Sequence, residues 1–88
     1  MDKRKPGRPT GDRMIRFRAR VAEMLPMLGE FVKKSDLVND MDIREIFPHD
    51  KIRANMVGFE LKRLEARGVL ENINGAVGFS RIVRLDLL

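Results

Sequence analysis

Apolar residues recur at helical spacing in the first third of the chain. They follow one another at intervals of three or four, the period of one helix face, at Phe17, Val21, Met24, Leu25 and Leu28. Pro26 lies inside this pattern and has no N–H to give to the preceding turn, so we expect a kink or a break near Leu25. Gly29 is expected to end the element.

A clearer helical pattern runs through KIRANMVGFELKRLEARG, residues 51–68. Its apolar face is made of Ile52, Val57, Leu61 and Leu64. Glu60 and the charged residues within 62–67 are predicted to lie on the outside of this helix. Gly68 suits the left-handed position that stops a helix, so we expect the helix to end there.

Shorter elements are predicted between these two helices. Phe31 and Val32 favour a short strand, and Ser35 is typical of an N-cap. The helix after Ser35 would bury three apolar residues, Leu37, Val38 and Met41. The stretch DIREIFPHD, residues 42–50, predicts no definite element, although Asp50 can cap whatever follows it.

The last twenty residues alternate in a way that favours strands. VLENI and AVGFS flank the dipeptide Asn74-Gly75, which is typical of a tight β-turn, so the pair predicts an antiparallel hairpin. In RIVRLDLL, residues 81–88, Val83, Leu85 and Leu87 alternate with polar or opposite-facing positions, so the final strand is predicted to reach the end of the sequence.

Composition removes several functional classes. The 88 residues contain no cysteine, which excludes disulfides, cysteine-ligated zinc and thiol chemistry. His49 is the single histidine and is expected to be an exposed loop residue, so no enzymatic activity and no metal or other cofactor is predicted. No apolar run is long enough to span a membrane and no secretory signal is recognisable, so we expect a cytoplasmic protein with no membrane partner.

The net charge of +5 is concentrated at the beginning of the chain. Residues 1–20 contain eight basic and two acidic residues, whereas residues 21–88 contain ten basic and eleven acidic residues. A basic segment attached to a nearly neutral body is common in proteins that bind a phosphate backbone, because each neutralised phosphate releases counterions. A solubilising tail explains the same charge, and the two interpretations stay open at this point.

The order of predicted elements and the phrase LKRLEARGVLE, residues 61–71, resemble the winged helix-turn-helix of MarR-like and related bacterial regulators. The resemblance covers residues 21–87 and implies that Val57, Leu61 and Leu64 are buried. It places Arg53, Ala54, Asn55, Gly58 and Phe59 toward a DNA major groove, with Arg53 and Asn55 as base readers. The remaining implied DNA contacts are Lys51, Lys62 and, from the wing, Arg81 and Arg84.

Three departures from the family are visible in the sequence. About seven extra residues, REIFPHD, stand where a tight turn is expected, and the extra C-terminal helix that many such regulators use to dimerise is missing. Acidic residues that would repel a phosphate backbone surround the second helix: Asp36, Asp40, Asp42, Glu45 and Asp50.

The segment RKPGRP, residues 4–9, resembles an AT-hook, the motif that lies in the minor groove of AT-rich DNA. The resemblance implies that Gly7 permits close approach, Arg8 inserts into the groove and Pro9 keeps the segment extended. Flanking phosphates would be met by Lys3, Arg4, Lys5 and Arg13. Pro6 replaces a second inserting arginine, so a weak hook is expected.

These observations predict a mainly α fold with a small β-hairpin (α+β), in the order helix, strand, helix, helix, strand, strand. Residues 1–13 are expected to form a disordered basic arm, and residues 14–88 the winged helix-turn-helix domain. The predicted function is binding of AT-rich double-stranded DNA by a transcriptional regulator or nucleoid-associated factor of a bacterium, phage or plasmid. The alternative is a protein-interaction module that docks on a host regulatory protein, with the arm as a non-specific tether. A homodimer also stays open.

Overall fold

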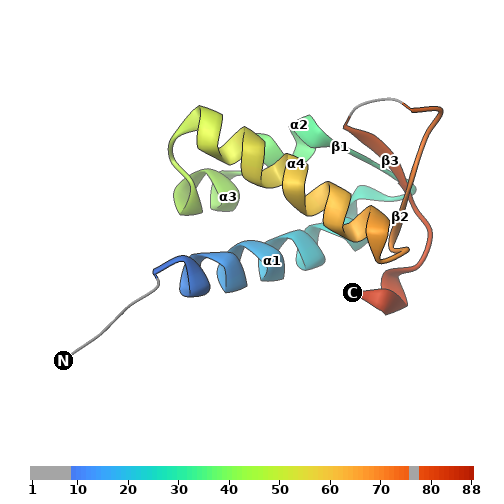
Figure 1. The fold of residues 1–88 in the computed structure, drawn as a ribbon, viewed down its shortest axis with the longest axis horizontal. Coiled ribbons are helices and arrows are strands. Elements are labelled where there is room, and N and C mark those ends of the chain that lie inside the picture. Colours follow the sequence, from blue (N-terminus) through green and yellow to red (C-terminus); the bar gives the residue numbers. More distant parts are fainter. Residues whose placement is uncertain (1–8, 76–77) are drawn as a thin grey trace.

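The computed structural model describes residues 9–75 and 78–88. Its helices are α1 (Pro9–Leu28), α2 (Lys34–Val38), α3 (Met41–Ile46) and α4 (Asp50–Ala66). Its strands are β1 (Phe31–Lys33), β2 (Leu70–Asn72) and β3 (Phe79–Ile82), and a 3-10 turn, η1 (Leu85–Leu87), follows them. The prediction of a mainly helical α+β chain with a small antiparallel sheet is therefore confirmed (Figure 1).

The three strands form one antiparallel sheet in the order β1-β3-β2 at one end of the molecule (Figure 1). Val32 pairs with Ser80 on the buried face, where the Ser80 hydroxyl donates to Glu65 at 2.7 Å. On the opposite face the rings of Phe31 and Phe79 stack with their centroids 5.4 Å apart. The hairpin predicted around Asn74-Gly75 is formed by β2 and β3, and β1 pairs with the other edge of β3 as a third strand.

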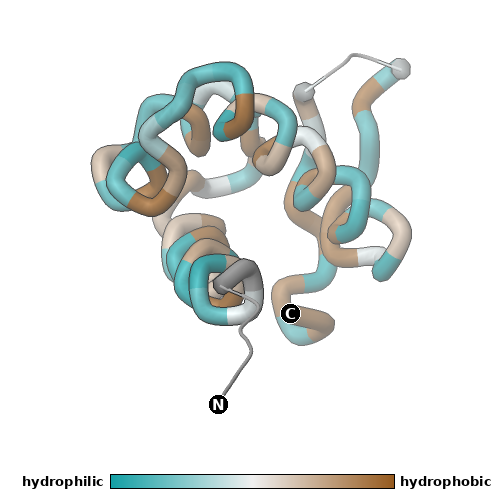
Figure 2. The backbone as a smooth tube through the Cα atoms, turned by 60° about the vertical axis from the view of Figure 1, so that its left-hand side comes forward, coloured by the Kyte–Doolittle hydropathy of each residue, from teal (hydrophilic) through white to brown (hydrophobic). Residues whose placement is uncertain are grey.

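The core lies between α1, α3, α4 and the inner face of the sheet. Figure 2 shows hydrophobic segments of the helices turned toward the centre and hydrophilic segments toward solvent. Phe17 of α1 meets Phe47, which follows α3, edge to face with centroids 5.3 Å apart. The other large, completely covered residues include Leu25, Leu37, Ile43 and Leu64. These helical contacts fix the direction in which α4 presents its outer face.

The first helix begins earlier than the sequence predicted, and it ends at Leu28, directly before Gly29, as expected. It begins at Pro9, so residues 9–13 belong to the helix and not to the arm that was predicted to span residues 1–13. Proline is favoured at a helix start because its missing N–H has no helical partner there. Of the kink or break predicted near Leu25, the break is wrong, since the helix continues through the exposed Pro26 to Leu28. Burial of Leu25 outweighs the single hydrogen bond lost at Pro26.

The segment that predicted no definite element contains α3. Asp40 caps this helix by accepting from the Ile43 N–H at 3.1 Å, and Ile43, Ile46 and Phe47 are buried behind it. Met41, predicted to be buried, is exposed because it begins the helix on the solvent side. The observed order therefore has one helix more than predicted.

The boundaries of three other elements differ from the prediction. Helix α2 begins at Lys34, with the Asp36 carboxylate accepting from the Lys33 N–H, and Ser35 is not its cap. His49 is exposed as expected, but it caps α4 through Nδ1, the position predicted for Asp50. The final strand ends at Ile82 and the chain turns into η1, so the strand predicted to run to residue 88 is too long.

In α4 the buried face was predicted only in part. Val57, Leu61 and Leu64 are buried and Gly68 follows the helix with φ +86°, both as expected. Ile52, placed on the apolar face by the prediction, is 49% exposed. Glu60, predicted on the outside, is 3% exposed and accepts from Arg63 and from Arg18 of α1. The buried stripe therefore keeps Val57, Leu61 and Leu64, loses Ile52 and gains Arg53 and Glu60.

Candidate nucleic-acid interface

One solvent-facing stripe of α4 brings together three of the predicted contact residues. Lys51, Asn55 and Lys62 are exposed, and Gly58 between them is half-buried. Their spacing of three or four residues puts them on the same side of the helix. The opposite side buries Val57, Leu61 and Leu64, so the core orients this stripe outward.

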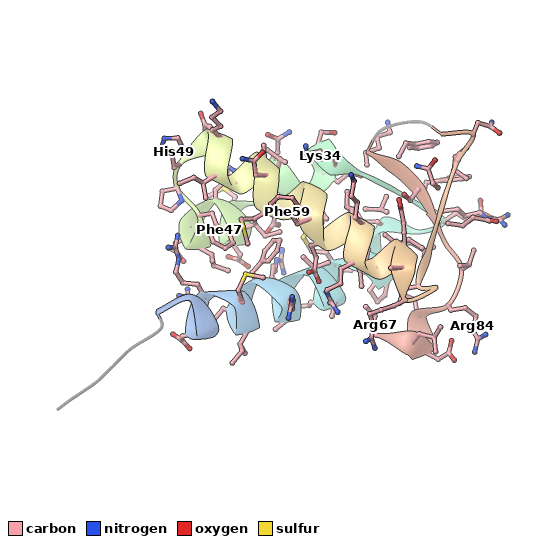
Figure 3. All side chains as sticks on the ribbon, in the orientation of Figure 1. Lys34, Phe47, His49, Phe59, Arg67 and Arg84 are labelled. Carbon is pink, nitrogen blue, oxygen red and sulfur yellow. The ribbon has the colours of Figure 1, made fainter. Side chains whose placement is uncertain are left out.

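Lys34, the first residue of α2, lies along the same stripe. A β-carbon placed on Gly58 would lie 3.4 Å from Lys34 Nζ, so the lysine side chain passes close to the α4 backbone. The Lys34 N–H donates to the Gly78 carbonyl at 2.7 Å, which ties the start of α2 to the β2–β3 connection. Figure 3 shows Lys34 beside α4, between this helix and the strands.

The stripe of α4, Lys34 and the hairpin enclose an open groove of about 410 Å³. Lys34 and Lys62 supply positive charge, Asn55 and Asn72 supply amides, and Phe59 supplies an aromatic ring. Glycines at positions 58, 75 and 78 line it without side chains. The groove therefore combines cations, hydrogen-bonding amides and backbone that a ligand can approach closely.

The positive charges beside this groove are not engaged by other side chains of the described residues, so a ligand can reach them. Within residues 9–75 and 78–88, no hydrogen bond or ion pair engages the side chains of Lys34, Lys51 or Lys62. The acidic residue of the groove, Glu65, accepts a hydrogen bond from Ser80, which holds its carboxylate toward the sheet. A polyanion would meet free ammonium groups at the rim.

Arg53 does not belong to this surface, and the prediction that it reads bases is wrong. Its side chain is 4% exposed and donates to the carbonyls of Val38 at 2.8 Å, Phe47 at 2.9 Å and Pro48 at 3.2 Å. It also contacts Asp50 Oδ1 at 2.6 Å. Since Val38 ends α2 and Phe47 follows α3, this guanidinium satisfies carbonyls that the helix ends leave without partners.

Three further predicted contacts are engaged elsewhere. Arg13 lies in α1, donates to the Ile46 carbonyl at 2.9 Å and stacks over the Phe47 ring, so it is not an arm residue. Arg81 pairs with Glu71 at 2.7 Å on the outer face of the sheet. Arg84 pairs with Asp86, and this contact lowers the pKa of the Asp86 carboxyl. Both pairs are exposed to solvent.

The predicted arm falls almost entirely outside the described residues. Lys3, Arg4, Lys5, Gly7 and Arg8 lie in residues 1–8, and Pro9 is the first residue of α1. In Figure 1 this end of α1 lies beside α3, at the opposite end of the molecule from the sheet.

Three of the five acidic residues expected to repel a polyanion, Asp40, Asp42 and Asp50, are paired with arginines within the fold. Arg20 forks onto Asp40 with contacts of 2.8 and 3.0 Å and also pairs with Asp42 at 3.3 Å. The hydrogen bonds from Arg20 hold the pKa of Asp40 below its usual range, and those from Arg53 do the same for Asp50. These three carboxylates thus stabilise the fold, and their repulsion of a ligand is reduced.

Two groove residues were missed or undervalued by the sequence. Lys34 reaches the groove because α2 packs against α4, which no local pattern could indicate. Phe59 was placed toward a DNA major groove by the resemblance but was given no role there, and it lines the groove. The sequence could have indicated that Arg53 lies on the buried side of α4, since position 53 is one turn before the buried Val57.

Comparison with protein-family models, curated protein sequences and solved structures finds no match for this chain. Among the described residues, no group of three or more acidic or histidine side chains could hold a metal ion. None of the described helices has the length and apolar character needed to cross a membrane.

Proposed function

We propose that this chain is a non-enzymatic, double-stranded DNA-binding protein of the winged helix-turn-helix type, acting as a transcriptional regulator or nucleoid-associated factor. In this proposal α4 enters the major groove and the β2–β3 hairpin is the wing. The arrangement of one long helix with an accessible face, flanked by an antiparallel hairpin, supports it. The added helix α3 replaces the tight turn of the family without covering that face.

The observation that carries the proposal is the availability of cations in the groove between α4 and the hairpin. Lys34 and Lys62 have no acidic partner among the described residues, although most arginines of the fold do. Asn55 lies between them, and a carboxamide can bond two atoms of adenine in the major groove. Phosphate contacts from the lysines would set position, and Asn55 would read sequence.

The basic residues 1–8 add a second contact in this proposal, along the minor groove of AT-rich DNA. The start of α1, which these residues precede in the sequence, lies at the end of the molecule away from the hairpin (Figure 1). In this proposal the arm and α4 contact different stretches of the duplex. Two weak contacts on one chain gain affinity through effective concentration.

A salt titration of binding to a duplex tests the proposal. The logarithm of the affinity should fall linearly with the logarithm of salt, and Lys34→Met or Lys62→Met should each reduce the slope by about 0.9. Arg16→Met is the matched control, because it removes one exposed positive charge from α1, outside the groove. Equal effects of all three variants would show that only total charge matters.

Removal of residues 1–8 separates the two contacts and tests the protein-interaction alternative. This truncation leaves α1 intact, whereas deletion of residues 1–13 would remove its first turn and Arg13. The shortened chain should still bind DNA at low salt with weaker AT preference. Loss of all binding would favour an interaction module with a basic tether.

A further inference from the structure

Phe59 is distinguished from the other phenylalanines by its environment. Phe17 and Phe47 are buried against each other, and Phe31 stacks on Phe79. Phe59 is 66% exposed, and no aromatic partner is found for it among the described residues. Figure 3 shows it on the middle of α4, away from the core.

The position of this ring within the groove restricts what it could bind. Phe59 follows Asn55 by one helical turn and precedes Lys62 by three residues, so all three project to one side. Its neighbour Gly58 has no side chain, and Leu61, which also lines the groove, is buried, so Phe59 is the large exposed apolar group of the groove. A matching ligand needs anionic groups at the rim and an apolar group within reach of the ring.

Duplex DNA meets both requirements in a specific way. Its phosphates line the groove edges, and the thymine 5-methyl is the apolar group that its base pairs present in the major groove. The lysines at the rim would meet the phosphates, because their charge is complementary to the backbone. We propose that Phe59 determines specificity by packing against thymine 5-methyl groups, next to bases contacted by Asn55.

This inference rests on the proposed function and adds a readout that the function itself does not require. DNA binding through lysines alone would not distinguish thymine from uracil, which lacks the methyl group. The arm would not distinguish them either, because the methyl lies in the major groove and the arm is proposed to occupy the minor groove.

The experiment compares one AT-rich duplex of about 30 base pairs, prepared with thymine or with deoxyuridine at every T position. The full-length protein should bind the uracil duplex about fourfold more weakly for each methyl contacted, the scale of one buried CH₂ group. Phe59→Ala should bind both duplexes equally, and Phe59→Leu should recover part of the difference. Ile15→Ala is the matched control, since Ile15 is 69% exposed on α1 and lies outside the groove.

The possible outcomes distinguish the role of Phe59 from DNA binding itself. Equal binding of both duplexes by the full-length protein would overturn the role of Phe59 and leave DNA binding in place. An unchanged thymine preference in Phe59→Ala would assign the effect to DNA shape and overturn the inference as well. Absence of binding to either duplex at low salt would refute the proposed function and the inference together.

Discussion

The arginines around α3 and the lysines around the hairpin use positive charge in opposite ways. Arg13, Arg20 and Arg53 donate to carbonyls and carboxylates that hold α1, α3 and α4 together. Lys34 and Lys62 lie beside the groove without such partners in the described chain. The planar guanidinium suits several fixed acceptors at once, whereas an ammonium on a flexible stem remains adaptable. A basic side chain near a candidate site therefore indicates ligand binding only when the structure shows that it is not paired within the fold.

The largest expected effect is on stability, at Arg53. Arg53→Met would leave the carbonyls of Val38 and Phe47 buried without their donor, and should lower the free energy of unfolding by about 3 kcal/mol. Urea denaturation of wild type and variant measures this difference in the free energy of unfolding. Arg16→Met, which removes an exposed arginine, should change stability by less than about 0.5 kcal/mol. A similar loss in both variants would contradict a structural role specific to Arg53.

How far the sequence could predict this molecule is illustrated by α4. The periodicity of Val57, Leu61 and Leu64 correctly indicated its buried side. Arg53 and Glu60 share that side by spacing, but their polarity led the prediction to place them outside. Their burial depends on carbonyls and arginines from distant segments, and single-sequence patterns carry no information on such partners.

The candidate site was predictable to a similar degree. The exposed stripe of Lys51, Asn55 and Lys62 follows from helix geometry once the core side of α4 is known. Lys34 could not be predicted, since it joins the groove through the packing of α2 and the bond to Gly78. Local cues such as Gly68 and Asn74-Gly75 were reliable because glycine and asparagine themselves tolerate the positive φ that these turns need.

Asp40 should show the next largest effect, together with a pH dependence. Asp40→Ala removes the α3 cap and both bonds from Arg20, and should cost about 2 kcal/mol at pH 7. The pKa of Asp40 is lowered in the folded protein, so its contribution is present above the unfolded value near 4 and is lost as the pH falls below it. The difference between wild type and variant in urea denaturation should shrink at pH 3.

Asp86→Asn provides the comparison for this pH effect. Asp86 is also paired with an arginine, but both partners are exposed, so the variant should change stability much less than Asp40→Ala does. A constant difference between wild type and Asp40→Ala from pH 7 to pH 3 would rule out the proposed linkage.

The backbone at Gly78 joins the hairpin to Lys34 at the start of α2, and a substitution there should show an intermediate effect. Gly78→Ala would force a side chain into φ +70° and place its β-carbon 2.9 Å from Lys34 Cβ, at an expected cost of about 2 kcal/mol. Gly75→Ala has a similar φ of +72° in open space, so about 1 kcal/mol is expected. Thermal unfolding measures both, and equal losses would exclude a steric contribution from Lys34.

The smallest effect is expected at Arg81, where the two uses of charge can be compared directly by DNA affinity. At 0.1 M salt Lys62→Met should weaken binding about eightfold, the value of one released counterion. Arg81→Met should weaken it only about twofold, because Arg81 is already paired with Glu71 at 2.7 Å and must exchange one anion for another. Glu71→Gln would release Arg81 from its ion pair and should strengthen DNA binding by about twofold. If Arg81→Met instead equalled Lys62→Met, the ion pair would have to open on binding, and the distinction between engaged and available cations would not hold at the hairpin.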